Sequence, residues 1–226
     1  MLKKTVLTLA FLTIFTTFYG FNVRFSTPAT DDGLNDEALE EITPLDLLLK
    51  ETPACVISNY DPLIRTISEE EGNDWRLLSA IAYHESRFTP DITSRSGAKG
   101  LMQIMPSVAR QFDVPVEMVS DPATNVRLAN KLLSKIEASL GIPQGVSETD
   151  RMSIVLACYN GGIGNVADAR RLARAHWENP KSWEVVARYL TLKAQPEYYE
   201  NEVVRCGRFT GSRQTLAYVE DVLERY

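Results

Sequence analysis

The chain has 226 residues, of which 44% are hydrophobic, and a formal net charge of −6 at pH 7. This length suffices for one domain with a real hydrophobic core plus an N-terminal extension. Because the net charge is negative and no basic stripe accompanies it, nucleic acid is a poor candidate partner.

Residues 1–20 have the pattern of an export signal. Lys3 and Lys4 form a basic start, and a charge-free apolar stretch from Thr5 to Tyr19 follows. At about 15 residues this stretch is short for a membrane span, which needs roughly 20. We therefore expect a signal peptide or an N-terminal anchor. Either one implies export to the periplasm or cell envelope, and an anchor would add membrane association.

Residues 21–53 are acidic and rich in turn-forming residues, so we interpret them as a flexible linker before a domain at 54–226. Cys55 and Cys206 stand near the two ends of that domain. In an exported protein, a disulfide between them would tie its first segment to its last helices. Cys158 lies inside an apolar helical pattern and is expected to pack as a small hydrophobic side chain.

The domain itself is predicted to be a succession of helices. Caps, prolines and apolar spacing predict helices at 62–71, 75–86, 106–112, 122–140, 152–159, 163–176, 182–192, 196–206 and 212–226. Asp61 and Asp121 each precede a proline, the pattern of an N-cap followed by the first helical residue. Asn73 or Asp74 can cap the second helix, and Asp150 the fifth. Only residues 91–94 leave room for a short strand or hairpin. The prediction is an α-rich single globular domain of about eight or nine helices.

Glu85 is conspicuous because a carboxylate stands on the apolar stripe of the second helix. Leu78, Ile81 and Glu85 have the spacing i, i+3 and i+7, which places them within roughly 40° of one another. Burial disfavours the charged form, and so does the negative end of the helix dipole. Both effects raise the pKa of Glu85 toward that of a general acid. The ordinary alternative is a glutamate that ends a helix and turns to water.

Four motifs weigh against that alternative. They are His84-Glu85-Ser86-Arg87-Phe88, the stretch from Ser94 to Pro106, Ala157-Cys158-Tyr159-Asn160-Gly161-Gly162, and Thr215-Leu216-Ala217-Tyr218-Val219. In this order they resemble the motifs of the family 1 lytic transglycosylases, over roughly residues 57 to 226. The stretch 182–199 is most similar to the catalytic domain of the membrane-bound lytic transglycosylase F group. The resemblance implies a lysozyme-like α+β fold in which helices predominate.

The resemblance also implies a role for individual residues. It makes Glu85 the single catalytic acid/base. The substrate-binding positions that it implies are Ser94, Ser96, Met102, Gln103, Tyr159, Asn160 and Tyr218. Gln103 is unusual on its own account, because an amide within an apolar run needs a hydrogen-bond partner, and a sugar hydroxyl or amide fits.

Members of this family cleave the MurNAc-β-1,4-GlcNAc bond of peptidoglycan without water. The C6 hydroxyl of MurNAc attacks its own anomeric carbon and leaves a 1,6-anhydro ring, so one carboxyl suffices where ordinary glycosidases use two. The sequence agrees, since Asp91 is the only other acid between Glu85 and Gln103. The expected partner is the peptidoglycan glycan strand, bound by a monomer without a cofactor.

Two alternatives stay open. A hydrolase of the goose-lysozyme or chitinase kind would share the fold but would need a water held by a second carboxylate, either Asp91 or Asp113. A glycan-binding module that has lost catalysis is the other. A zinc-protease site is not favoured, because position 88 is phenylalanine and His176 is the only histidine besides His84. We expect no metal, and His84 to be a helix-face residue.

Overall fold

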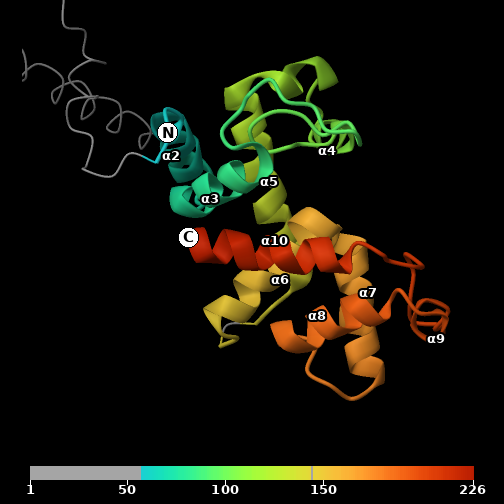
Figure 1. Cartoon of the computed structure of the whole chain (residues 1–226). Helices are drawn as coiled ribbons and strands as arrows, with labels where there is room; N and C mark the ends of the chain where they lie inside the picture. Colours follow the sequence, from blue (N-terminus) through green and yellow to red (C-terminus); the bar gives the residue numbers. More distant parts are fainter. Residues whose placement is uncertain (1–56, 144) are drawn as a thin grey trace, which may run out of the picture. The chain divides into compact units, whose positions relative to one another are not determined.

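The computed structural model describes residues 57–143 and 145–226, which belong to the unit Thr52–Tyr226. Its helices (Figure 1) are α2 (Asp61–Glu71), α3 (Trp75–Ser86), α4 (Pro106–Gln111), the 3₁₀ helix η1 (Val116–Ser120), α5 (Pro122–Leu140), α6 (Glu148–Gly161), α7 (Ile163–Ala175), α8 (Trp183–Leu192), α9 (Pro196–Tyr199) and α10 (Ser212–Arg225). Outside the helices, isolated antiparallel bridges join Thr93 with Lys99 and Lys99 with Ile104. The predicted α-rich class with at most a short hairpin is confirmed.

The expected export signal, linker and Cys55 lie outside the described residues. The disulfide between Cys55 and Cys206 therefore stays a prediction. Within the described part, no helix has the length and apolarity needed to cross a membrane. Cys158 is 2% exposed and packs in the core, as expected, and burial raises the pKa of its thiol to about 12.

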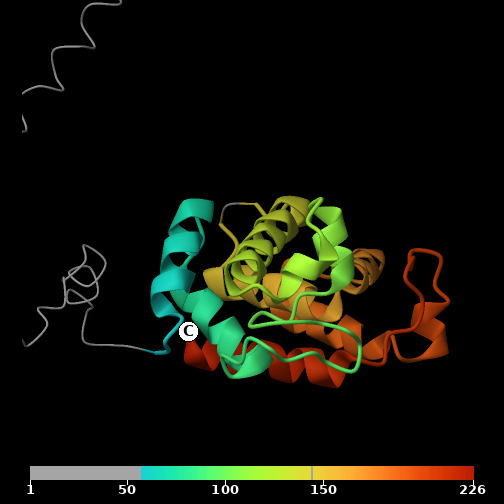
Figure 2. The same cartoon turned by 90° about the horizontal axis from the view of Figure 1, so that it is seen from above.

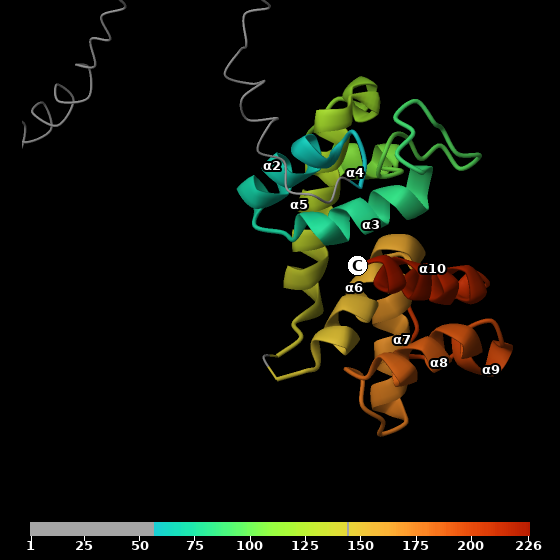
Figure 3. The same cartoon turned by 60° about the vertical axis from the view of Figure 1, so that its left-hand side comes forward.

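The long helix α5 connects two groups of helices. It packs against α2, η1, α3 and α4 on one side and against α6 on the other. Helix α10 runs back from the second group and packs against α6, α8 and α3, and it lies alongside α3 in Figures 1 and 3. Seen from above in Figure 2, the segment after α3 folds back on itself before α4 begins. The helices α3, α6 and α10 and this loop carry the candidate site.

Two of the predicted helix caps are confirmed, and the one predicted for α2 is not. The Asp121 carboxylate accepts from the Thr124 amide and caps α5 as predicted, and Asp74 caps α3 in the same way. Asp61 is instead the first residue of α2, where its carboxylate accepts from the amides of Ile57 and Ser58. Its predicted role as N-cap was wrong.

Helix α6 begins earlier than predicted because Ser147, not Asp150, is its N-cap. The Ser147 hydroxyl accepts from the Asp150 amide at 3.1 Å. The Asp150 carboxylate is thereby free to accept from the backbone amide of Trp183 at 2.6 Å. Asp150 thus links the first turn of α6 to the start of α8, a connection between residues 33 positions apart.

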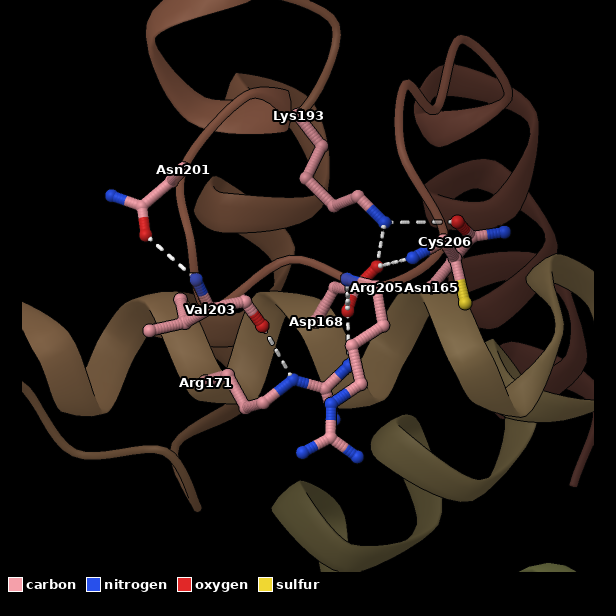
Figure 4. A network of polar contacts seen from close by, with 8 residues as sticks. All are labelled: Asn165, Asp168, Arg171, Lys193, Asn201, Val203, Arg205 and Cys206. Atoms are coloured by element: carbon pink, nitrogen blue, oxygen red, sulfur yellow. Dashed lines mark hydrogen bonds and ion pairs between the residues drawn. The ribbon is translucent and has the colours of Figure 1, made fainter.

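The predicted helix 196–206 ends at Tyr199, and Figure 4 shows the polar contacts of residues beyond that end. The backbone amides of Arg205 and Cys206 donate to the Asp168 carboxylate at 2.8 and 2.9 Å instead of continuing a helix. Lys193 donates to the same carboxylate at 2.7 Å, and both charged side chains are completely buried. Burial alone would raise the pKa of Asp168, but these hydrogen bonds lower it overall. This buried pair positions the segment that leads into α10.

Candidate active site

Glu85 lies in the last turn of α3 and is half-buried. Burial raises the pKa of its carboxyl to about 7, against a smaller lowering by the Tyr218 hydroxyl. The direction predicted from the apolar stripe is confirmed. A carboxyl with this pKa holds its proton in a large fraction of molecules at neutral pH and can donate it.

Two tyrosines from different helices stand close to Glu85. Burial and the Glu85 charge raise the pKa of Tyr159 on α6 and of Tyr218 on α10, so both hydroxyls stay protonated. The Tyr159 hydroxyl donates to the Met102 carbonyl at 2.8 Å. The Tyr218 hydroxyl is buried beside the Glu85 carboxyl, yet it has no hydrogen-bond partner of good geometry in the described part of the chain. It is therefore placed to donate to Glu85 after a small movement.

The loop after α3 is held at both ends by buried polar side chains that were not predicted from the sequence. The Ser86 hydroxyl, next to Glu85, donates to the Leu101 carbonyl at 2.8 Å. Asn125 on α5 accepts from the Met102 amide at 2.8 Å and donates to the carbonyls of Lys99 and Val119 at 2.9 and 2.8 Å. Asn125 is fully buried on the core face of α5. An amide at a core position was the signal that could have identified it.

Gly100 is required by this clamp. Its φ is +78°, and a Cβ added there would lie 2.5 Å from the Asn125 side-chain nitrogen. Gly97, in the same loop, has φ +87° but no atom within 4 Å of an added Cβ. A side chain at either position would strain the left-handed backbone, and only at Gly100 would it also collide with Asn125.

Replacing Gly100 with alanine is expected to lower the free energy of unfolding by about 2–4 kcal/mol, from left-handed strain plus overpacking against Asn125. Gly97→Ala, the matched control, should cost only the strain, about 1–2 kcal/mol. Urea denaturation of both variants measures the difference. Equal losses would mean that contact with Asn125 does not constrain the loop.

Three of the other predicted substrate-binding residues, Ser94, Ser96 and Asn160, make hydrogen bonds within the protein. Ser94 accepts from the Ala98 amide at 2.9 Å and pairs with the exposed Ser96 hydroxyl at 3.0 Å, so Ser96 faces solvent and Ser94 closes a turn. The Asn160 side-chain oxygen accepts from the Thr215 hydroxyl at 2.9 Å, which joins α6 to α10.

Met102 and Gln103 differ from expectation. The Met102 side chain is 0% exposed, so it packs in the core, whereas the resemblance implied a substrate-binding position. Its backbone instead connects Asn125 to Tyr159. The Gln103 amide, which seemed to need a sugar, donates to the Gly100 carbonyl at 3.0 Å within its own loop.

A second catalytic carboxylate finds no support in this geometry. Asp91 and Asp113 are both exposed, and neither contributes to the pKa shift of Glu85. Two surface hollows, of about 520 Å³ between α6, α8 and α10 and about 280 Å³ beside α5, are not lined by Glu85. Within the described residues, the site therefore has one carboxyl, that of Glu85, with the hydroxyls of Tyr159 and Tyr218 near it.

Known proteins share this sequence pattern. The profile of the Transglycosylase SLT domain matches residues 62–181. Membrane-bound lytic murein transglycosylase F of Alcanivorax borkumensis is 36% identical over 167 residues, covering 74% of this chain and 34% of the relative. The protein of the same name from Serratia proteamaculans is 30% identical over 210 residues, covering 90% and 42%. The chain thus spans well under half the length of these relatives.

Among solved structures, the 70 kDa soluble lytic transglycosylase of Escherichia coli is 23% identical, with a TM-score of 0.47. The comparison covers 80% of this chain and 25% of that one.

Proposed function

This chain belongs to the Transglycosylase SLT domain family, and from that premise we propose that it is a peptidoglycan lytic transglycosylase. It cleaves the MurNAc-β-1,4-GlcNAc bond without water and leaves 1,6-anhydroMurNAc ends. The observation that carries this proposal is the half-buried Glu85 carboxyl, whose pKa is about 7 and on which no second carboxylate acts. The names of the curated relatives support the same reaction class.

Each step of the reaction uses Glu85. The protonated carboxyl donates its proton to the glycosidic oxygen as the bond from that oxygen to the MurNAc C1 breaks, and GlcNAc departs with a new hydroxyl. The Glu85 carboxylate then takes the proton of the MurNAc C6 hydroxyl, whose oxygen bonds to C1 and closes the anhydro ring. The carboxyl ends protonated, and no water is consumed.

The two tyrosines act on the charge that appears during this cycle. When Glu85 gives up its proton, a buried anion forms, and a hydrogen bond from a neighbouring hydroxyl stabilises it. Tyr218, with an uncommitted buried hydroxyl, is the donor for this step. Tyr159 already donates to Met102 and therefore also fixes the loop beside the sugar.

Sugar contacts are proposed for the polar positions of the loop and of α6. These are Ser94, Ser96, Gln103 and Asn160. Ser96 and Asn160 each make one side-chain hydrogen bond within the protein, and the Ser96 hydroxyl is also exposed, so Ser96 is the strongest of them. Met102 contributes through its backbone only.

The protein is proposed to act outside the cytoplasm, on peptidoglycan strands in the cell envelope. The pattern of residues 1–20 and the names of the relatives, which describe them as membrane-bound and murein-acting, support this location.

The products test the proposal directly. Digestion of purified peptidoglycan should give muropeptides that end in 1,6-anhydroMurNAc, each lighter by one water than a reducing-ended fragment. Mass spectrometry distinguishes the two. Reducing ends would instead favour the lysozyme-like hydrolase, and binding without cleavage by the folded protein would favour the glycan-binding module.

A further inference from the structure

We propose that His84 and Asp221 form a positioning pair that holds Tyr218 against the Glu85 carboxyl. The inference deepens the proposed function, because it assigns the placement of a proton donor to two residues outside the reacting groups. His84 directly precedes Glu85 on α3, and Asp221 follows Tyr218 by one turn on α10.

The pair connects the two helices at the level of the site. The His84 Nε2 atom lies 3.3 Å from the Asp221 Oδ2 atom. The imidazole also packs edge to face on the Tyr218 ring, with centroids 4.6 Å apart and an interplanar angle of 77°. Tyr218 and Asp221 are i and i+3 on α10, so both point to the same side and His84 contacts both. Figure 3 shows α10 lying along α3 in this region.

Tyr218 depends on this contact because little else orients its polar end. Its side chain is 1% exposed and its hydroxyl has no well-formed hydrogen bond in the described residues. A buried unpaired hydroxyl costs about 1–3 kcal/mol, so the ring would turn toward another partner if it were free to do so. The His84 ring blocks that movement, and the hydroxyl stays beside Glu85.

The charges around His84 leave the imidazole neutral at neutral pH. Burial lowers its pKa, Asp221 raises it, and Arg87 and Arg225 lower it further. Both guanidinium groups rest on Tyr83, at 4.0 and 4.1 Å from the ring centroid. A neutral imidazole supplies a donor and a ring face without adding a cation that would lower the pKa of Glu85.

The pair contributes position and only modest stability. The Asp221 side chain is 54% exposed, so water competes for its contact with the neutral imidazole and the contact contributes little to folding free energy. A variant can therefore lose the contact and still fold. Activity and the titration of Glu85 are the properties that should change.

The test uses His84→Ala and Asp221→Asn in the full chain, with His176→Ala as the matched control. His176 follows α7 and stacks on Tyr189, and it forms neither an aromatic pair with Tyr218 nor an ion pair with Asp221. We expect His84→Ala to lower kcat about tenfold with KM unchanged, the effect of one hydrogen bond to a charged group. Asp221→Asn should lower kcat less, and His176→Ala should not change it.

A second readout is independent of turnover. The Tyr218 hydroxyl lowers the pKa of Glu85, so losing its placement should raise that pKa. Carbon-13 NMR titration of the Glu85 carboxyl, without substrate, measures the shift in His84→Ala against wild type. An unchanged Glu85 titration in a folded variant, or a loss of activity through KM alone, would overturn the proposal. A wild-type protein that yields no anhydro ends would instead refute the proposed function and leave the NMR result valid.

Discussion

Replacing Glu85 with glutamine is expected to reduce turnover of peptidoglycan by a factor of at least about 10²–10⁴, the usual contribution of a general acid/base. Glutamine keeps the size and polarity of the side chain, but it can neither donate a proton to the leaving oxygen nor take one from the C6 hydroxyl. Glycan binding should persist, because Glu85 is not needed to hold the strand. Release of soluble muropeptides from purified peptidoglycan measures the loss.

Asp91→Asn and Asp113→Asn are the matched controls for this experiment. Both carboxylates are exposed, and neither shifts the pKa of Glu85. We expect wild-type rates from both variants. A comparable loss in either one would support the two-carboxylate hydrolase instead of a single acid/base.

The Glu85→Gln variant should be more stable than the wild type at alkaline pH. Burial raises the folded-state pKa of Glu85 from 4.5 to about 7, so its contribution to stability is complete below pH 4.5 and is lost as the pH rises to about 7. At pH 8 the wild type must hold a buried anion, and glutamine avoids this at a gain on the order of 3 kcal/mol. Thermal unfolding at pH 4 and pH 8 should show the gain only at pH 8.

Wild-type activity should decline above about pH 7, as the proton donor is lost.

Asp168→Ala is expected to destabilise the fold by about 3–5 kcal/mol, because it leaves the fully buried Lys193 without its counter-charge. The change also removes the acceptor for the amides of Arg205 and Cys206 (Figure 4). The segment before α10 should loosen, and activity should fall with it because α10 carries Tyr218. Urea denaturation and hydrogen exchange of residues 200–211 measure these effects.

Two variants serve as controls for the Asp168 prediction. Glu70→Gln breaks the exposed pair with Arg127 and should change stability by no more than about 1 kcal/mol. Asp168→Asn combined with Lys193→Met removes both charges and should recover part of the loss. If Asp168→Ala costs no more than Glu70→Gln, the buried pair does not hold this segment.

The features predicted correctly are those that neighbouring residues specify. The cap of α5 by Asp121 and the end of that helix at Gly141 involve residues within one turn of the helix terminus. The apolar stripe of α3 places Glu85 toward the core by periodicity alone, and burial then raises its pKa. Short motifs, above all those around Glu85 and from Ser94 to Pro106, indicate the family.

Predictions that required distant partners were wrong or were not made. The helix expected at 196–206 ends at Tyr199, and the amide of Arg205 donates to Asp168 instead. These two residues are 37 positions apart. The Met102 backbone is held by Asn125, 23 positions away, and the Met102 side chain, expected to bind substrate, is buried. The core position of Asn125 is visible in the sequence, but the partners of Asn125 and Asp168 are not, because a buried amide or carboxylate takes whichever donors the packed helices bring to it. Helix periodicity and caps are thus readable along the chain, whereas the placement of the loop, of Tyr218 and of its contact with His84 follows from how α3, α5, α6 and α10 pack.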